Sequence, residues 1–287
     1  MSERVKERMD PFTDPGFKRI FGQELTKELL ISFLNALLEG EREITDVIFL
    51  DKEQLRETAD GRTLVYDIFC KTKDEEDYFI VEMQNQMRPN YKKRSIYYTA
   101  RAIARQGEAG KRWEYDIKAV YCISFLNYTS NLISTKFRTD VALMDMESGK
   151  LFSDDVRLIY LQLPRFKKTV EECETLFDKW IYVLRHMDVL ERLPKELQLD
   201  IFKVLDEVTD LNSLTKEERI QYDYAMKCYR DSIGMIKGAK EEGRQEGRQE
   251  GRQEGLQESA RNLKALGASW EMIQAATGLT IEEIEQL

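Results

Sequence analysis

Three polar side chains with the chemistry of a metal site lie on two short strands that the sequence predicts to be neighbours. Asp67 belongs to a strand expected over residues 64–71, and Glu82 and Gln84 belong to a strand expected over 78–84. Both segments are rich in apolar, β-branched and aromatic residues, which is typical of strands. Carboxylate and amide oxygens are ligands that hard cations such as Mg²⁺ prefer. A cation held there would activate water for phosphodiester hydrolysis.

The polar turn between the two strands determines how the carboxylates meet. With the hairpin centred between Asp74 and Glu75, Asp67 and Glu82 are equally distant from the turn and lie opposite one another. Residues in that position have Cβ atoms ~5 Å apart, and like charges there destabilise the pair. A divalent cation between the two carboxylates is the simplest compensation. We therefore expect Asp67 and Glu82 to bind Mg²⁺, with Mn²⁺ as an alternative.

Gln84 shares the face of Glu82 because side chains alternate along a strand, whereas Val81 and Met83 point the other way. The alternative interpretation is a solvent-exposed strand face that carries ordinary polar residues. Two features favour the metal site: the flanking residues of both strands are strongly apolar, and a basic helix follows directly.

That helix is expected over residues 91–106, within a segment (88–112) that carries eight basic side chains against the single acidic Glu108. Such a local charge indicates a polyanionic partner. Four of its side chains follow at helical spacing on one face: Arg94, Tyr98, Arg101 and Arg105. Together with Lys92 and Lys93 they suit contacts to the phosphates and bases of DNA. Ile96, Ala100 and Ile103 form a separate apolar face. The alternative is a basic, solvated helix face.

The composition excludes several other kinds of protein. The 287 residues carry a net charge of −9, which argues against a general DNA-coating protein, and only one histidine, which excludes a multi-histidine metal site. The four cysteines are far apart, so we expect reduced core thiols rather than a zinc site. With no secretory signal and no apolar run of membrane-spanning length, we expect a cytoplasmic protein with no membrane association.

The order of predicted elements indicates an α/β fold. A helix over 25–38 precedes strands over 44–50, 64–71 and 78–84, the basic helix, and a strand over 117–126. This α-β-β-β-α-β order makes a mixed sheet with helices on its faces. A further strand is expected over 157–163, residues 127–155 are not assigned, and the rest is helical: 170–192, 195–208 and 216–236. We expect one domain over 10–237 and a separate tail over 238–287.

The tail contains the repeat GRQEGRQEGRQEGLQE at 243–258. On a lone helix its glycines cost about 1 kcal/mol each against alanine, and its like charges are four residues apart, which destabilises the helix. Pairing with a second helix is more favourable, because the line of glycines permits close approach of the two helices. The Arg residues on one side of this line and the Glu residues on the other could be matched by opposite charges of the partner helix. A period of four would give such a pair a right-handed supercoil. The alternative is a solvated, low-complexity linker.

Gly267 is predicted to end one helix, and two short helices joined by a tight turn at Gly278 are expected after it. Ser269 can cap one helix, and Thr280 with Glu283 forms a capping box for the next. The arrangement is similar to a helix-turn-helix, but the final helix carries three glutamates, which phosphates would repel. We therefore expect packing or self-association, with a homo-oligomer formed through the tail.

Near the N-terminus, Asp14 and Lys18 lie in the segment TDPGFKRIF. Asp14 before Pro15 is typical of a helix N-cap followed by proline at the first helical position. This structural role is sufficient for Asp14. We keep Asp14 and Lys18 as candidates for a supporting position near the active site.

These motifs together resemble the recombination-promoting nuclease and transposase family within the PD-(D/E)XK nuclease superfamily. The likeness rests on DPGFKRIF (14–21), LVYDIFCKT (64–72), YFIVEMQ (78–84) and RSIYYTARAIARQ (94–106), and on the glycine-bearing tail with its GLTIEEI ending. It covers nearly the whole chain, and the order and spacing of the motifs make it specific. The resemblance implies a restriction-endonuclease-like mixed β-sheet core, a helical C-terminal region and metal-dependent cleavage of DNA.

By the family motif, Asp67 and Glu82 would bind magnesium, and Gln84 would stand where the superfamily often has lysine. Lysine brings a positive charge that can stabilise a developing phosphorane, whereas glutamine supplies hydrogen bonds only. The leading hypothesis is a magnesium-dependent DNA endonuclease that promotes recombination, with Asp67, Glu82 and Gln84 as its catalytic residues. Two alternatives stay open: a catalytically weak or inactive DNA-associated, regulatory protein that retains the nuclease fold, and a self-assembling module whose biology depends on the tail.

Overall fold

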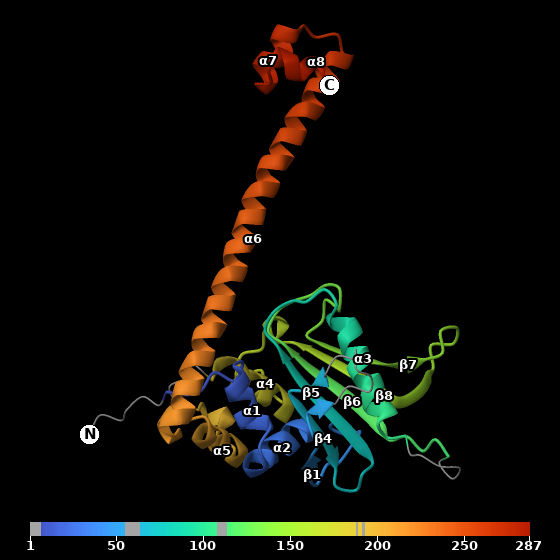
Figure 1. Ribbon diagram of the computed structural model, residues 1–287, viewed down its shortest axis with the longest axis vertical. Helices are drawn as coiled ribbons and strands as arrows, with labels where there is room; N and C mark the ends of the chain where they lie inside the picture. The colour runs from blue at the N-terminus through green and yellow to red at the C-terminus, as the bar shows by residue number, and fades with distance from the viewer. Residues whose placement is uncertain (1–6, 55–63, 108–113, 188, 191–192) are drawn as a thin grey trace, which may run out of the picture. The chain divides into compact units, whose positions relative to one another are not determined.

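The computed structural model describes residues 7–54, 64–107, 114–187, 189–190 and 193–287. The chain divides into two compact units, Met1–Ala225 and Met226–Leu287. Each unit is described by itself; Figure 1 gives the element labels. The expected domain boundary after residue 237 stays a prediction.

The first unit is built on a mixed sheet of six strands in the order β1-β4-β5-β6-β8-β7. The parallel pairs are β5 with β6 and β6 with β8, and the other neighbours are antiparallel. The strands are β1 (Val47–Phe49), β4 (Ile68–Thr72), β5 (Asp77–Gln84), β6 (Ala119–Leu126), β7 (Arg138–Met144) and β8 (Leu151–Gln162). A two-stranded sheet joins β2 (Glu53–Gln54) to β3 (Leu64–Val65). The α/β class and the predicted mixed sheet are confirmed, and β7 lies in the segment that the sequence left unassigned.

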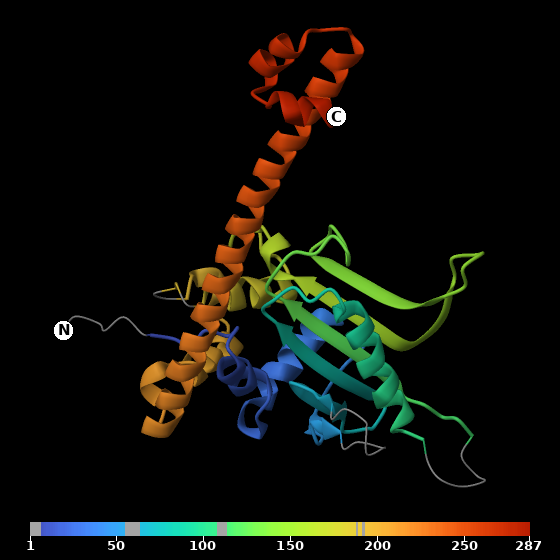
Figure 2. The same cartoon turned by 45° about the horizontal axis from the view of Figure 1, so that its top comes forward.

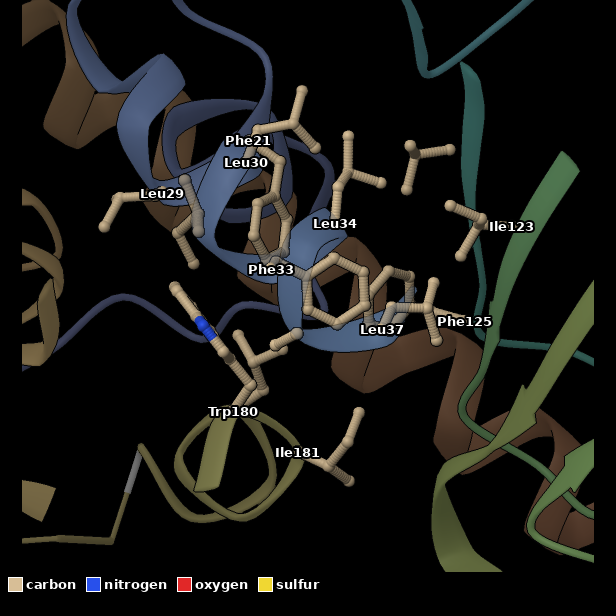
Figure 3. Close-up of a cluster of buried hydrophobic side chains, with 14 of the residues drawn as sticks. Phe21, Leu29, Leu30, Phe33, Leu34, Leu37, Ile123, Phe125, Trp180 and Ile181 are labelled. Carbon is tan, nitrogen blue, oxygen red and sulfur yellow. The ribbon is translucent and has the colours of Figure 1, made fainter. Parts of the chain in front are cut away.

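Four helices cover one face of this sheet: α1 (Asp14–Phe21), α2 (Lys27–Leu37), α4 (Leu176–His186) and α5 (Asp200–Val208). Their apolar faces and alternate residues of the strands form the main core. Trp180 of α4 is fully buried there, at 5.9 Å from Phe21 and 6.1 Å from Phe33 between ring centroids, and its indole N–H donates to Ser32 Oγ at 3.2 Å. The Phe21 and Phe33 rings in turn lie 5.9 Å and 5.0 Å from the Phe125 ring of β6 between centroids, and Figure 3 shows this cluster. Short 3-10 turns lie between the helices, namely η1 (Glu24–Thr26), η3 (Lys195–Leu197) and η4 (Leu211–Ser213), and a further one, η2 (Leu163–Arg165), follows β8.

Helix α3 (Tyr91–Ala104) packs on the opposite face, as Figures 1 and 2 show. Tyr91, Tyr98 and Ala102 contribute to a second apolar cluster with residues of β4, β5, β6 and β8. Two polar residues of the helix are also buried. Ser95 Oγ lies 2.7 Å from the Tyr160 hydroxyl and Thr99 Oγ1 donates to the Ser95 carbonyl, so both are satisfied and can face the sheet.

In the second unit, α6 (Lys216–Ala265), whose first turns belong to the first unit, is followed by α7 (Trp270–Thr277) and α8 (Ile281–Glu285). The glycine repeat is therefore helical, as the paired-helix interpretation requires. Ala260, Ile273, Leu279 and Ile284 form a small core at the end of the chain. The predicted terminators, caps and capping box are all confirmed: Gly267 (φ +79°), Gly278 (φ +74°), Ser269, and Thr280 with Glu283.

Candidate metal centre

The hairpin of β4 and β5 has the register that the sequence predicts. Ile68 pairs with Val81 and Lys71 with Tyr78, so the next residues beyond this ladder are Asp67 and Glu82. The two are in contact: the backbone N–H of Asp67 donates to Glu82 Oε1 at 3.2 Å. The Asp67 carboxylate accepts the backbone N–H of Met83 at 2.8 Å. The two acidic residues thus continue the ladder through their side chains.

A β-bulge lies on the other side of Asp67. The ladder from β1 ends where the N–H of Leu50 donates to Phe69, and the ladder of β2 and β3 begins where the N–H of Tyr66 donates to the Lys52 carbonyl. Two residues (51–52) therefore oppose three (66–68). A bulge bends its strand and re-aims a side chain, and such features are common beside active sites. The bulge explains why the backbone N–H of Asp67 points toward Glu82 of β5 rather than toward residues 51–52 on the other side.

Glu82 is the most perturbed group of this site. Its side chain is 1% exposed. Burial, and next the negative charge of Asp67, raise the pKa of the Glu82 carboxyl to about 8, while Arg94 and the Asp67 N–H act in the opposite direction. Burial also raises the pKa of Asp67, opposed first by its bond from the Met83 N–H. Two adjacent carboxyls, with Glu82 buried and Asp67 half-buried, disfavour simultaneous charge and are suited to binding a divalent cation.

Gln84 and Arg94 both reach Glu82. The sequence predicts the position of Gln84 on the face of Glu82, whereas the contact of Arg94 is a finding of the structure. Gln84 is 9% exposed, and its amide donates to Glu82 Oε2 at 3.4 Å. The Arg94 guanidinium donates to the same oxygen at 3.3 Å and stacks over the Tyr98 ring, 4.8 Å from its centroid. Strand alternation therefore gives the expected neighbours, and one basic side chain of α3 is held at the carboxylates.

The expected placement of Tyr98 on an exposed face of α3 with the arginines is wrong. Tyr98 is 7% exposed and packs edge-on against Tyr66, with centroids 5.2 Å apart, so its ring belongs to the core. Conversely, Ile96 is 54% exposed, so the predicted apolar face is largely at the surface. The prediction failed because two polar residues, Ser95 and Thr99, occupy buried positions of the helix. The buried face of α3 therefore differs from the face on which its apolar residues lie.

The basic residues of α3 therefore divide into two groups. Arg94 and Arg101 are partly buried, whereas Lys92, Lys93 and Arg105 are exposed. Lys92 donates to the Leu132 carbonyl at 3.2 Å. Of the wider basic segment, Lys111 and Arg112, with the opposing Glu108, lie outside the described residues.

Asp14 and Lys18 lie close enough to the hairpin for their charges to act on the pKa of Asp67, the former raising it and the latter lowering it. They form an i,i+4 ion pair at 2.8 Å. The expected N-cap is shifted by one residue: the Thr13 side chain accepts the Gly16 N–H, and Asp14 begins α1.

The sequence missed Lys52. It is half-buried beside the bulge, and its pKa is lowered by burial and by the charge of Lys18, against Asp14 and Asp67. In the sequence, Lys52 could have been noticed only because it follows β1, the strand that pairs with β4 next to Asp67.

The donor set fits a hard cation. Two adjacent carboxylates and the amide oxygen of Gln84 are oxygen ligands of the kind that Mg²⁺ takes, with water completing its shell. Among the described residues no group of three or more His, Cys, Asp and Glu side chains lies together in a way that could hold a metal. The four cysteines are free thiols; Cys70, Cys122 and Cys173 are buried, whereas Cys228 is exposed, so the expectation of core thiols is wrong for Cys228.

Comparison with known proteins gives one match. The family model described as "PD-(D/E)XK nuclease family transposase" matches residues 11–239, which is most of the chain. No curated protein and no solved structure matches. In the described part of the chain, none of the helices has the length and apolar character needed to cross a membrane.

Proposed function

Because the chain belongs to the PD-(D/E)XK nuclease family of transposases, we propose that it is a magnesium-dependent DNA endonuclease centred on Asp67 and Glu82. The observation that carries the proposal is the meeting of these two carboxyls at the end of one hairpin ladder, with Glu82 buried. A buried carboxyl beside a second carboxyl is costly to ionise unless a cation accompanies the two. A nuclease that needs a divalent cation gives a reason to keep the pair.

The roles of the individual residues follow from their contacts. Asp67 and Glu82 would hold the cation, which when bound polarises the scissile phosphate and lowers the pKa of a bound water. Gln84, whose amide already lies at Glu82, would orient that water. Arg94 balances the charge of Glu82. Arg101 and the exposed Lys92, Lys93 and Arg105 would bind DNA phosphates.

The test is nicking of supercoiled plasmid with and without Mg²⁺. We expect Glu82→Gln and Asp67→Ala to lower the rate about 100-fold or more, the scale of losing a group that stabilises charge in the transition state. The matched control is Glu76→Gln, because Glu76 lies at the turn of the same hairpin with a side chain that is 64% exposed. Wild-type rates in the Glu82 and Asp67 variants would show the assignment to be wrong. The family resemblance also leads us to propose a role in DNA recombination, which an assay of recombination frequency with the same variants would test.

The alternative function is that of a DNA-associated protein with weak or no cleavage. It is favoured by one observation: in place of the superfamily lysine stands Gln84, whose amide donates to Glu82 and brings no positive charge to the site. This alternative predicts salt-sensitive DNA binding with no magnesium-dependent product at any protein concentration.

We also propose that the tail mediates self-association in either case. The repeat is helical, and the space beside each of its glycines (243, 247, 251 and 255) is open. Light scattering of the full chain and of a chain ending at Lys240 tests this: a mass that stays oligomeric after truncation would place the interface elsewhere.

A further inference from the structure

Lys52 occupies a position beside the carboxylates that neither the family motif nor the roles above use. Its carbonyl accepts the N–H of Tyr66, the residue that precedes Asp67, at 3.1 Å. Lys52 thus lies across the bulge from Asp67, on the side opposite Glu82. The hairpin and the bulge place Asp67 between a lysine on one neighbouring segment and a glutamate on the other.

The surroundings of Lys52 are those of a functional lysine rather than of a solvated one. Its side chain is half-buried, and its pKa is lowered first by burial and then by the neighbouring charge of Lys18. Within the described parts of the chain, its ammonium group has no hydrogen bond or ion pair. A half-buried ammonium group next to a second lysine is unfavourable unless a negatively charged group joins it. Asp14 and Asp67 are near enough to act on it but do not pair with it.

The other cations of the site are already engaged. Lys18 forms its ion pair with Asp14, and its side chain is 40% exposed. Arg94 donates to Glu82 and lies over the Tyr98 ring. Among the residues that the structure describes, Lys52 is therefore a basic side chain near Asp67 whose hydrogen-bonding capacity is left for a ligand.

We propose that Lys52 binds the scissile phosphate and supplies the positive charge that Gln84 does not bring to the site. The inference rests on the proposed endonuclease function. In the hydrolysis, the water oxygen forms a bond to phosphorus and gives up a proton to solvent, while the bond from phosphorus to the leaving oxygen breaks and that oxygen takes up a proton from solvent. Lys52 stays protonated throughout, donates to a non-bridging phosphate oxygen and stabilises the negative charge that grows there. The bulge at Asp67 thereby brings the Lys52 ammonium group to the site, where β5 carries Gln84 and no positive charge.

The experiment compares Lys52→Met, which keeps an unbranched apolar stem without the charge, with Lys52→Arg, which keeps the charge. Lys73→Met is the matched control, because Lys73 lies on the same hairpin with a side chain that is 70% exposed. Single-turnover nicking is measured with saturating protein in Mg²⁺, and DNA binding is measured in EDTA. We expect Lys52→Met to slow nicking about 100-fold, with DNA affinity within about threefold of wild type. Lys52→Arg should keep at least about a tenth of the rate, and Lys73→Met all of it.

A second readout separates an electrostatic role from a structural one. Removing a positive charge beside Asp67 should lower the Mn²⁺ concentration for half-maximal binding, measured by Mn²⁺ electron paramagnetic resonance without DNA, whereas Lys52→Arg should leave it unchanged. If wild type nicks DNA and Lys52→Met nicks it equally fast, the role of Lys52 is refuted while the proposed function stands. If Lys52→Arg is as slow as Lys52→Met and neither alters Mn²⁺ binding, Lys52 is structural. If wild type gives no magnesium-dependent product, both proposals fail.

Discussion

Replacing Glu82 with glutamine should make the metal-free protein more stable at alkaline pH, although it removes a residue of the proposed active site. Glu82 is 1% exposed, and burial with the nearby charge of Asp67 raises the pKa of its carboxyl to about 8 from a reference value of 4.5. The folded chain therefore prefers the neutral acid. Glutamine has the same shape and is neutral at every pH, so it reproduces the form that the fold favours.

The magnitude follows from linkage. A pKa difference of about 3.5 corresponds to about 5 kcal/mol, at about 1.4 kcal/mol for each pH unit. The sign is that of a raised acid: the stabilisation is fully present below pH 4.5 and is lost as the pH rises through about 8. Between these values the free energy of unfolding of the wild type should fall, and at pH 9 Glu82→Gln should exceed it by up to about 5 kcal/mol. Because the charge of Asp67 is one cause of the raised Glu82 pKa, the difference between the two proteins reports Glu82 together with its coupling to Asp67.

Urea unfolding in EDTA, followed by tryptophan fluorescence at several pH values between 4 and 9, measures this difference. Urea is uncharged and leaves the electrostatics unscreened. Repeating the series with Mg²⁺ should restore stability to the wild type at pH 8 and leave Glu82→Gln unchanged, since a bound cation stabilises the folded state. A difference between the two proteins that stays constant from pH 4 to 9 would refute the reasoning, because it would mean that Glu82 ionises as easily in the folded chain as in the unfolded one.

Three further outcomes are expected. Trp180→Ala should lower the free energy of unfolding by about 3–5 kcal/mol in urea, since the indole is fully buried among other rings; a loss below about 1 kcal/mol would contradict the packing described. Gly16→Ala should destabilise the first unit, because the added methyl carbon would lie 2.2 Å from a backbone carbonyl oxygen, whereas Gly243→Ala, which meets open space, should raise the helicity of α6 by circular dichroism. Replacing Lys92 and Lys93 together with glutamine should reduce the slope of log affinity for DNA against log salt by about 2, and an unchanged slope would remove them from the interface.

Local chemistry in the sequence was sufficient for the hairpin and for the terminal helices. The symmetry of the β4–β5 turn set the register that brings Asp67 to Glu82, because a tight connection leaves little freedom in pairing. The caps at Ser269 and Thr280 and the left-handed glycines 267 and 278 were predictable for the same reason: each depends on residues within one turn of the chain.

Contacts between distant segments decided the rest. The orientation of α3 depends on buried Ser95 and Thr99, and the Ser95 hydroxyl finds its partner 65 residues away in Tyr160. Tyr98 therefore became a core residue, although helical spacing alone placed it among the arginines. Lys52 depends on a bulge that only the pairing of three strand segments creates. The sequence by itself thus determined that Asp67 and Glu82 meet, because their pairing depends on one local hairpin. The tertiary structure decided which cations, Arg94 and Lys52, lie beside them, because these come from other segments whose packing cannot be predicted from a local pattern.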